Sequence, residues 1–284
     1  MLLWLMTACD GAANKTEPVA TETTAKQQTI MPPEKKNAPL PPPRNIPYTG
    51  KAKTIHVMVA LADNLHQGIV PVPDRIGNGQ KPETNLYWGA GYGVKNYFVR
   101  KTHDWRLLKS GKVNDTILER LVFRHRSKNF YLVADAYDGR YIRQTVTDFL
   151  QSLAGQRKDT LHVQGRTVGI YGNASLVAYV GHDGLMDFSL EDTFRNADGR
   201  RRDAIILACI SRDYFGPYVQ SAGARVLVWS TGLMAPEAYT LHDAIAAYTE
   251  GQSPEQIRLA AARAYARYQK CGLRAAKHLL VSGE

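Results

Sequence analysis

The sequence predicts an α/β protein of three layers, in which a mostly parallel sheet lies between two layers of helices. Two observations predict this fold. Short apolar runs rich in Val, Ile and Leu are typical of strands that are covered on both faces. They alternate with segments of helical spacing, and this alternation indicates a parallel sheet with helices on both sides.

The expected elements follow in chain order. Strands are expected at Thr54–Ala62, Phe130–Ala134, Leu176–Val180, Ala204–Ala208 and Arg225–Trp229. A Gly-containing helix is expected at Tyr87–Phe98, and a second helix is capped by Asp138 and ends at Gly155. Further helices are expected at Tyr218–Ala222, Ala235–Thr249 and Pro254–Lys270, the last capped by Ser253 with proline at its first position.

Composition excludes several classes of protein. The 284 residues are 44% hydrophobic and 9% aromatic, which excludes a wholly disordered chain. Only 3 Cys are present, too few for a disulfide scaffold or a Cys-rich zinc protein. The 36 Lys+Arg against 26 Asp+Glu give a net charge of +10, but the basic residues are scattered. No nucleic-acid-binding module is evident, and we expect no nucleic-acid partner.

The chain divides into three parts. Residues 1–9 are expected to be a lipoprotein-type signal segment, residues 10–52 a Pro-rich tether, and residues 53–284 the α/β domain. Met6-Thr7-Ala8-Cys9 resembles the lipobox of bacterial lipoproteins, in which the cysteine becomes the lipidated N-terminus. The segment lacks a basic region and is shorter than a normal signal peptide, which we interpret as a translation start upstream of Met1.

This resemblance implies a location. A lipid on Cys9 would anchor the protein in the bacterial cell envelope, on the periplasmic face, and Asp10 is similar to the inner-membrane retention signal of some Gram-negative bacteria. The alternative is an unstructured N-terminus with a chance Ala-Cys pair. A tethered protein with this basic surface would lie against anionic lipid headgroups.

Two residues with matched chemistry follow neighbouring strands. His182 follows the third expected strand after one residue, Gly181, and Cys209 directly follows the fourth. Chemistry collects at the carboxyl ends of parallel strands, so both side chains are expected on one rim. A thiol beside an imidazole suits acyl transfer, with Cys209 as nucleophile and His182 as general base and acid. The backbone N–H of Cys209, with that of Gly184 or Asp183, could form an oxyanion hole.

These residues resemble the caspase-like cysteine peptidases, the clan of caspases, legumains, gingipains and separases. The clan carries a hydrophobic strand ending in His-Gly and then one ending in Ala-Cys; here Leu176–Gly184 reads LVAYVGHDG and Ile205–Cys209 reads IILAC. The resemblance implies a caspase-like fold and a cysteine peptidase, or a related amide-bond hydrolase or transpeptidase, acting on a peptide or protein. One residue departs from the clan's pattern, because Asp183 lies between His182 and Gly184.

The end of the first strand is expected beside the third. In caspase-like enzymes this rim helps to form the substrate pocket, so Asp63, Asn64 and His66 are candidate pocket residues, with Ser230 and Thr231 as further candidates. An acidic Asp63 would suit a basic substrate residue, as in gingipains. As a solvated loop carboxylate it would need no function.

Other readings of the same residues stay open. Cys209 would also fill a strand end as a buried residue, and a disulfide with Cys271 would remove the nucleophile. The loop spacing of His182, Asp183 and Asp187 is poor for zinc, so we expect no metal and no cofactor. The rival function is a non-catalytic envelope lipoprotein of caspase-like fold that binds a peptide or cell-wall fragment. Asp183 favours this rival.

Overall fold

The computed structural model describes residues 44–283. The expected signal segment 1–9, the lipidation site Cys9 and most of the tether lie outside the described residues. Within residues 44–283, no helix is long and apolar enough to cross a membrane.

A mixed sheet forms the centre of the protein, and most of its inner strands are parallel. In the described part of the chain, eight strands pair in the order β10-β9-β8-β7-β1-β4-β3-β2. The five inner strands β9, β8, β7, β1 and β4 run parallel, and β10, β3 and β2 are antiparallel additions at the two edges. Their bounds are β1 Lys53–Ala60, β2 Trp105–Gly111, β3 Ile117–His125, β4 Phe130–Tyr137, β7 Leu176–Val180, β8 Asp203–Leu207, β9 Arg225–Ser230 and β10 Leu280–Val281.

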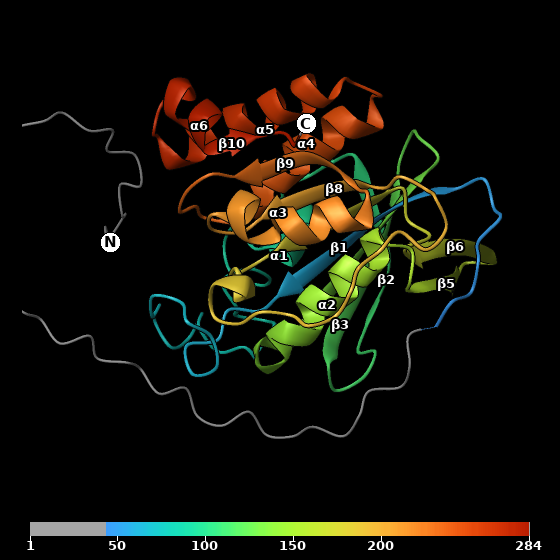
Figure 1. Cartoon of the computed structure of the whole chain (residues 1–284), viewed down its shortest axis with the longest axis horizontal. Helices are drawn as coiled ribbons and strands as arrows, with labels where there is room; N and C mark the ends of the chain where they lie inside the picture. Colours follow the sequence, from blue (N-terminus) through green and yellow to red (C-terminus); the bar gives the residue numbers. More distant parts are fainter. Residues whose placement is uncertain (1–43, 284) are drawn as a thin grey trace, which may run out of the picture.

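Helices cover both faces of this sheet (Figure 1). On one face lie α2 (Ile142–Leu153) and α3 (Ser211–Ala222), which pack through Val146, Phe149 and Phe215. The other face is covered by α1 (Val94–Arg100), α4 (Ala238–Thr249), α5 (Pro254–Gln269) and α6 (Leu273–Leu279). The three-layer α/β arrangement expected from the sequence is therefore present.

The strands buried on both faces are those that the sequence predicts best. After its first residue β1 is buried throughout, and β7 is buried at every position. Continuous apolar runs are what such strands need, since each alternate side chain faces a different helix layer. The structure confirms the five expected strands as β1, β4, β7, β8 and β9, with β7 ending at the expected residues.

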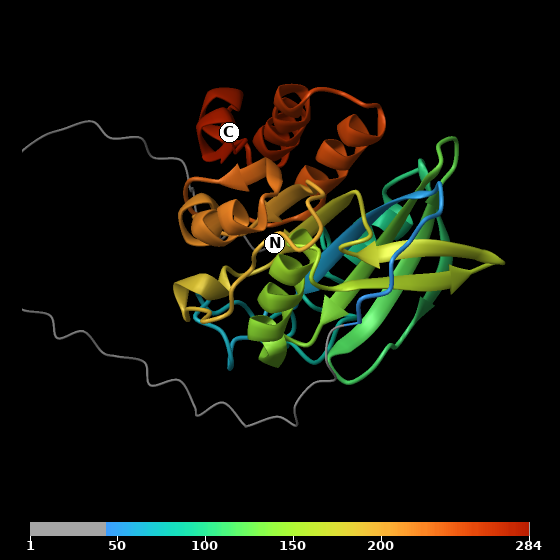
Figure 2. The same ribbon diagram turned by 45° about the vertical axis from the view of Figure 1, so that its right-hand side comes forward.

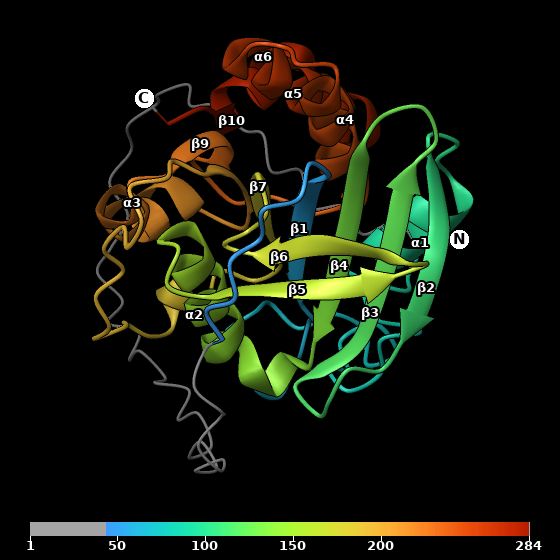
Figure 3. The same ribbon diagram turned by 90° about the vertical axis from the view of Figure 1, so that its right-hand side faces the viewer.

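A two-stranded hairpin was not expected from the sequence. Strands β5 (Lys158–Val163) and β6 (Arg166–Tyr171) project from the domain and lie across β4 and β3 on the face of α2 (Figures 2 and 3). Their turn residues Gln164 and Gly165 both have positive φ, as a two-residue hairpin turn requires. Polar and charged residues in these strands obscure the alternation that would have revealed them.

Two helix expectations are wrong in their bounds. Residues 87–93 form turns, and α1 begins only at Val94. The glycines explain this: a Cβ on Gly89 would meet the Glu83 carbonyl at 2.1 Å, and one on Gly93 would meet Trp88 backbone at 2.5 Å. In contrast, α3 starts at Ser211, well before the expected Tyr218, with Pro217 accommodated inside it.

Residues 44–48, at the end of the expected tether, form hydrogen bonds with the domain. Ile46 donates its N–H to the Lys158 carbonyl (3.1 Å), and Lys158 donates to the Arg44 carbonyl (2.8 Å). The N–H of Tyr48 donates to the side chain of Asn173 (3.2 Å). Residues 44–48 thus run beside the β5–β6 hairpin, upstream of the domain start expected at residue 53.

Candidate functional site

The strand register places His182 and Cys209 at the ends of neighbouring strands. In β7 and β8, Val180 pairs with Leu207, and the Gly181 N–H extends the ladder to the Leu207 carbonyl (3.2 Å). Two residues further along each chain come His182 and Cys209. Both therefore lie at the carboxyl ends of adjacent parallel strands, where the sequence predicts them. The first and third expected strands are also neighbours, since β1 pairs with β7.

The residue before His182 is a glycine that packs closely against the end of β1. Gly181 has φ +149°, and a Cβ there would lie 2.7 Å from the Ala60 carbonyl oxygen at the end of β1. An L side chain would meet both a strained backbone and a neighbouring strand. The glycine that precedes His182 is thus required by packing.

The imidazole of His182 has a carboxylate partner. Its Nε2 lies 2.7 Å from Oδ2 of Asp187, which also accepts the N–H of Gly68 (2.9 Å). Burial alone would raise the pKa of Asp187, but the hydrogen bonds from His182 and Gly68 bring it below its usual value. An ionised Asp187 fixes the orientation of the ring, as carboxylate partners of catalytic histidines do.

The thiol of Cys209 is half-buried and held by backbone. Its Sγ accepts the N–H of Met234 (3.4 Å) and lies 3.5 Å from the Met234 carbonyl. Burial raises the pKa of the thiol, the Met234 N–H opposes this, and the nearby Asp183 raises the pKa further. Cys209 is therefore a neutral thiol unless a base takes its proton.

The backbone turns sharply after the cysteine. Ile210 has φ +48° and ψ +29°, a left-handed conformation that is an outlier for a β-branched residue. The turn is held by the Ile210 N–H, which donates to the Gly232 carbonyl (2.9 Å). Such strain persists only where the surroundings enforce it, and it gathers at functional sites. It places Cys209 at a corner between β8 and the first turn of α3.

Three backbone N–H groups at these two strand ends have no acceptor in the described part of the protein. Within the described residues, the N–H groups of Asp183, Gly184 and Cys209 donate no hydrogen bond to the protein. They remain available to an anionic oxygen, as an oxyanion hole needs. The side chain of Asp183 begins the short 3₁₀ helix Gly184–Met186 by accepting the Leu185 N–H (3.0 Å).

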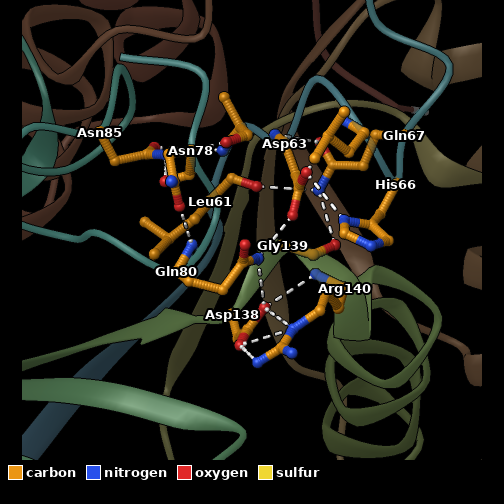
Figure 4. Close-up of polar contacts among 12 residues, drawn as sticks. Leu61, Asp63, His66, Gln67, Asn78, Gln80, Asn85, Asp138, Gly139 and Arg140 are labelled. Atoms are coloured by element: carbon orange, nitrogen blue, oxygen red, sulfur yellow. Dashed lines mark hydrogen bonds and ion pairs between the residues drawn. The ribbon is translucent and has the colours of Figure 1, made fainter. Parts of the chain in front are cut away.

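Asp63 lies in a buried hydrogen-bond network (Figure 4). Its Oδ1 accepts the Leu65 N–H (3.0 Å) and lies 2.9 Å from His66 Nδ1. Its Oδ2 accepts the Gln80 amide (2.6 Å), which also reaches Asp138 (2.9 Å). Asp63 is 1% exposed, so its carboxylate holds the loop after β1 together. A pocket role for Asp63 stays a prediction.

The other pocket candidates are placed as follows. Asn64 exchanges two hydrogen bonds with the Val72 backbone, and His66 keeps 38% of its side chain exposed. Ser230 is buried and binds the backbone of Ala208 and Ser211, so it supports the corner that carries Cys209. Thr231 donates to the His278 carbonyl (2.9 Å). Their contact with a substrate stays a prediction.

Comparison with known proteins gives no relative. No family model, no curated protein and no solved structure matches this chain at a significant level. The likeness to caspase-like peptidases therefore rests on the residues and geometry described above.

Two alternatives can be examined directly. Among residues 44–283, Cys209 and Cys271 are not joined by a disulfide. The same residues contain no group of three or more His, Cys, Asp or Glu side chains arranged to hold a metal ion.

Sequence reasoning missed two carboxylates of this rim. The sequence analysis assigns no partner role to Asp187, although an acid five residues after His182 in the same loop is the signal for one. Asp138 caps the helical turn after β4, as the sequence predicts, but it also follows β4 as Asp63 follows β1, and it binds Gln80 and Arg140. The rule that directed attention to the other strand ends applies to it equally.

Proposed function

We propose that this protein is a cysteine-dependent peptidase of caspase-like fold, an amide-bond hydrolase or transpeptidase. The observation that carries the proposal is the register of β7 and β8, which brings His182 and Cys209 to one corner of the sheet. Support comes from Asp187 on the imidazole and from the strained turn at Ile210. The strand order, with five parallel strands and antiparallel edges, is compatible with this fold.

The chemistry follows from these contacts. With Nε2 of His182 engaged by Asp187, the other ring nitrogen is left to accept the proton of the Cys209 thiol. The thiolate attacks the carbonyl carbon of the amide and forms a tetrahedral intermediate, whose oxyanion the N–H groups of Cys209 and Gly184 stabilise. His182 then protonates the leaving amine. Water, or an acceptor amine in a transpeptidase, resolves the thioester.

Because the pKa of Cys209 is raised, His182 must take the proton from its thiol. A buried, neutral thiol is a poor nucleophile by itself, so catalysis depends on proton transfer to the imidazole. The same property favours the rival function, in which the rim binds a peptide or cell-wall fragment without cleaving it. The two functions differ in whether Cys209 reacts through His182.

Alkylation of Cys209 tests this difference. The full chain is treated with iodoacetamide between pH 5.5 and 9, and modification of Cys209 and Cys271 is followed separately by peptide mass spectrometry. We expect Cys209 to react near neutral pH and His182→Ala to slow this reaction at least about tenfold. A matched control is His162→Ala, on the β5–β6 hairpin. If Cys209 is inert at neutral pH, or is indifferent to His182, the peptidase is excluded.

The proposed location is a separate part of the hypothesis. Lipidation at Cys9 would hold the protein at the periplasmic face of the bacterial inner membrane, where a peptide or protein would be its substrate. Expression of the full chain behind a lipoprotein signal peptide in a Gram-negative host, followed by membrane fractionation, tests this. We expect Cys9→Ala to release the protein from the membrane fraction, and retention would contradict the anchor.

A further inference from the structure

Asp183 is a carboxyl group in a place that does not suit a carboxylate. It directly follows His182, and the residue is 0% exposed. Its Oδ1 accepts one hydrogen bond, from the Leu185 N–H (3.0 Å). Its Oδ2 is buried and has no hydrogen-bond partner within the described residues. A buried carboxylate with one hydrogen bond and no cation is costly, whereas a neutral acid is tolerated.

The surroundings of Asp183 add further negative charge. Asp187, in the same loop, is ionised through its bonds with His182 and Gly68 and acts on Asp183 as a like charge. From β7, the buried hydroxyl of Tyr179 donates to the His182 carbonyl and so gives Asp183 no proton. His182, the preceding residue, is engaged by Asp187. Burial, with a smaller contribution from the like charge of Asp187, raises the pKa of Asp183 to about 7, and the Leu185 N–H opposes this.

The remaining neighbour is the thiol. Asp183 and Cys209 interact electrostatically, and a charge on Asp183 opposes ionisation of the thiol. Tyr87, from the segment before α1, also interacts electrostatically with Cys209 and is a neutral, buried phenol, because burial raises its pKa. The charge on Asp183 thus opposes the thiolate of Cys209 and varies with pH.

We propose that Asp183 is a positioning residue for Cys209: it works as a neutral carboxylic acid, and its ionisation suppresses the thiolate. Relative to a protein without this carboxyl group, the thiolate fraction of Cys209 is then unchanged at acidic pH and lowered at alkaline pH. Asp183, which interrupts the His-Gly pattern, has a use in this site that a glycine could not have. The inference rests on the proposed function only for its catalytic meaning, since the electrostatic coupling itself concerns two side chains.

The test compares alkylation of Cys209 in the full-length wild type and in Asp183→Asn across pH 5.5–9. The thiolate displaces iodide from iodoacetamide, so the rate follows the thiolate fraction. We expect equal rates near pH 6, where the side chain at position 183 is neutral in both proteins, and a variant about three- to tenfold faster at pH 8.5. Asp183→Ser, which keeps an acceptor for the Leu185 N–H, should behave alike. Asp192 is an exposed carboxylate of the same loop. For the control Asp192→Asn, the alkylation rate divided by that of the wild type should stay near one at every pH.

Repeating the comparison with His182→Ala separates the two hypotheses. The imidazole is absent from the His182→Ala variant. An inflection near pH 7 in its rate profile, with Asp183 still present, therefore reports on Asp183. If the ratio of the Asp183→Asn rate to the Asp183 rate varies with pH in this background, the coupling between Asp183 and Cys209 is supported, even if His182 does not activate Cys209. If the ratio is constant with pH and the rate profile lacks the inflection, the proposed role of Asp183 is overturned, even if His182 does activate Cys209.

Discussion

Nε2 of His182 lies 2.7 Å from Oδ2 of Asp187, and the same oxygen accepts the N–H of Gly68 at 2.9 Å. One carboxylate thereby joins the loop after β7 to the loop after β1. The imidazole is held by two segments far apart in sequence, and its orientation depends on both.

Asp187→Asn tests this arrangement. The amide keeps the size of the side chain but removes the charge that stabilises an imidazolium, so we expect His182-dependent alkylation of Cys209 at pH 7 to fall at least about tenfold. Asp192→Asn, exposed in the same loop, serves as the control. An unchanged rate would show that Asp187 does not act on the imidazole.

Gly181→Ala should be strongly destabilising. The new Cβ would lie 2.7 Å from the Ala60 oxygen at a φ of +149°, and we expect a loss of about 3 kcal/mol in the free energy of unfolding. Gly199→Ala is the matched control: φ is +69° there, but nothing lies within 4 Å, so only about 1 kcal/mol is expected. Urea unfolding followed by circular dichroism measures both, and equal losses would refute the packing argument.

Ile210→Gly should separate stability from reactivity. Glycine adopts the observed φ of +48° without strain, which favours stability by about 1 kcal/mol before any lost side-chain contacts are counted. The same change loosens the corner that fixes Cys209, so alkylation near neutral pH should slow. Thermal unfolding and the rate of alkylation are compared in one preparation. A faster reaction would show that the strained turn does not position the thiol.

Arg120→Met should destabilise the face that carries the hairpin. Arg120 contributes two bonds of 2.6 Å to the fully buried Asp135, whose other partner is His56 at 3.0 Å. Burial alone would raise the pKa of Asp135, but Arg120 and His56 bring it far below its usual value. Removing the guanidinium leaves a buried carboxylate, at a cost of about 3 kcal/mol or more. Arg126→Met, at an exposed position just after β3, should change little in the same urea titration.

Asp183 also predicts how stability varies with pH. Its folded-state pKa of about 7 lies above the usual 3.8, so the stabilisation it provides is complete below about pH 4 and is lost as the pH rises through 7. The full loss corresponds to about 4 kcal/mol. The free energy of unfolding of Asp183→Asn, minus that of the wild type, should therefore be larger at pH 8 than at pH 4.5. A difference that does not vary with pH would contradict the raised pKa.

The predictability of each element follows from its surroundings. Strand β7 lies between two helix layers, so its sequence LVAYV is wholly apolar and its bounds were found. Strands β2 and β3 and the β5–β6 hairpin carry charged side chains on partly exposed faces, and their pattern is weak. The helix expected from Tyr87 failed because three glycines allow a compact turn that apolar spacing cannot reveal.

For the site, the sequence alone determined the positions of His182 and Cys209, because residues that follow neighbouring parallel strands must meet at one edge of the sheet. It could not determine Asp187 as the partner of the imidazole, the use of Asp63 inside its own loop, or the burial of Asp183. These depend on how irregular loops fold back on one another. Loop conformation is fixed by individual hydrogen bonds and close contacts, which have no periodic signature, and only the tertiary structure decided it.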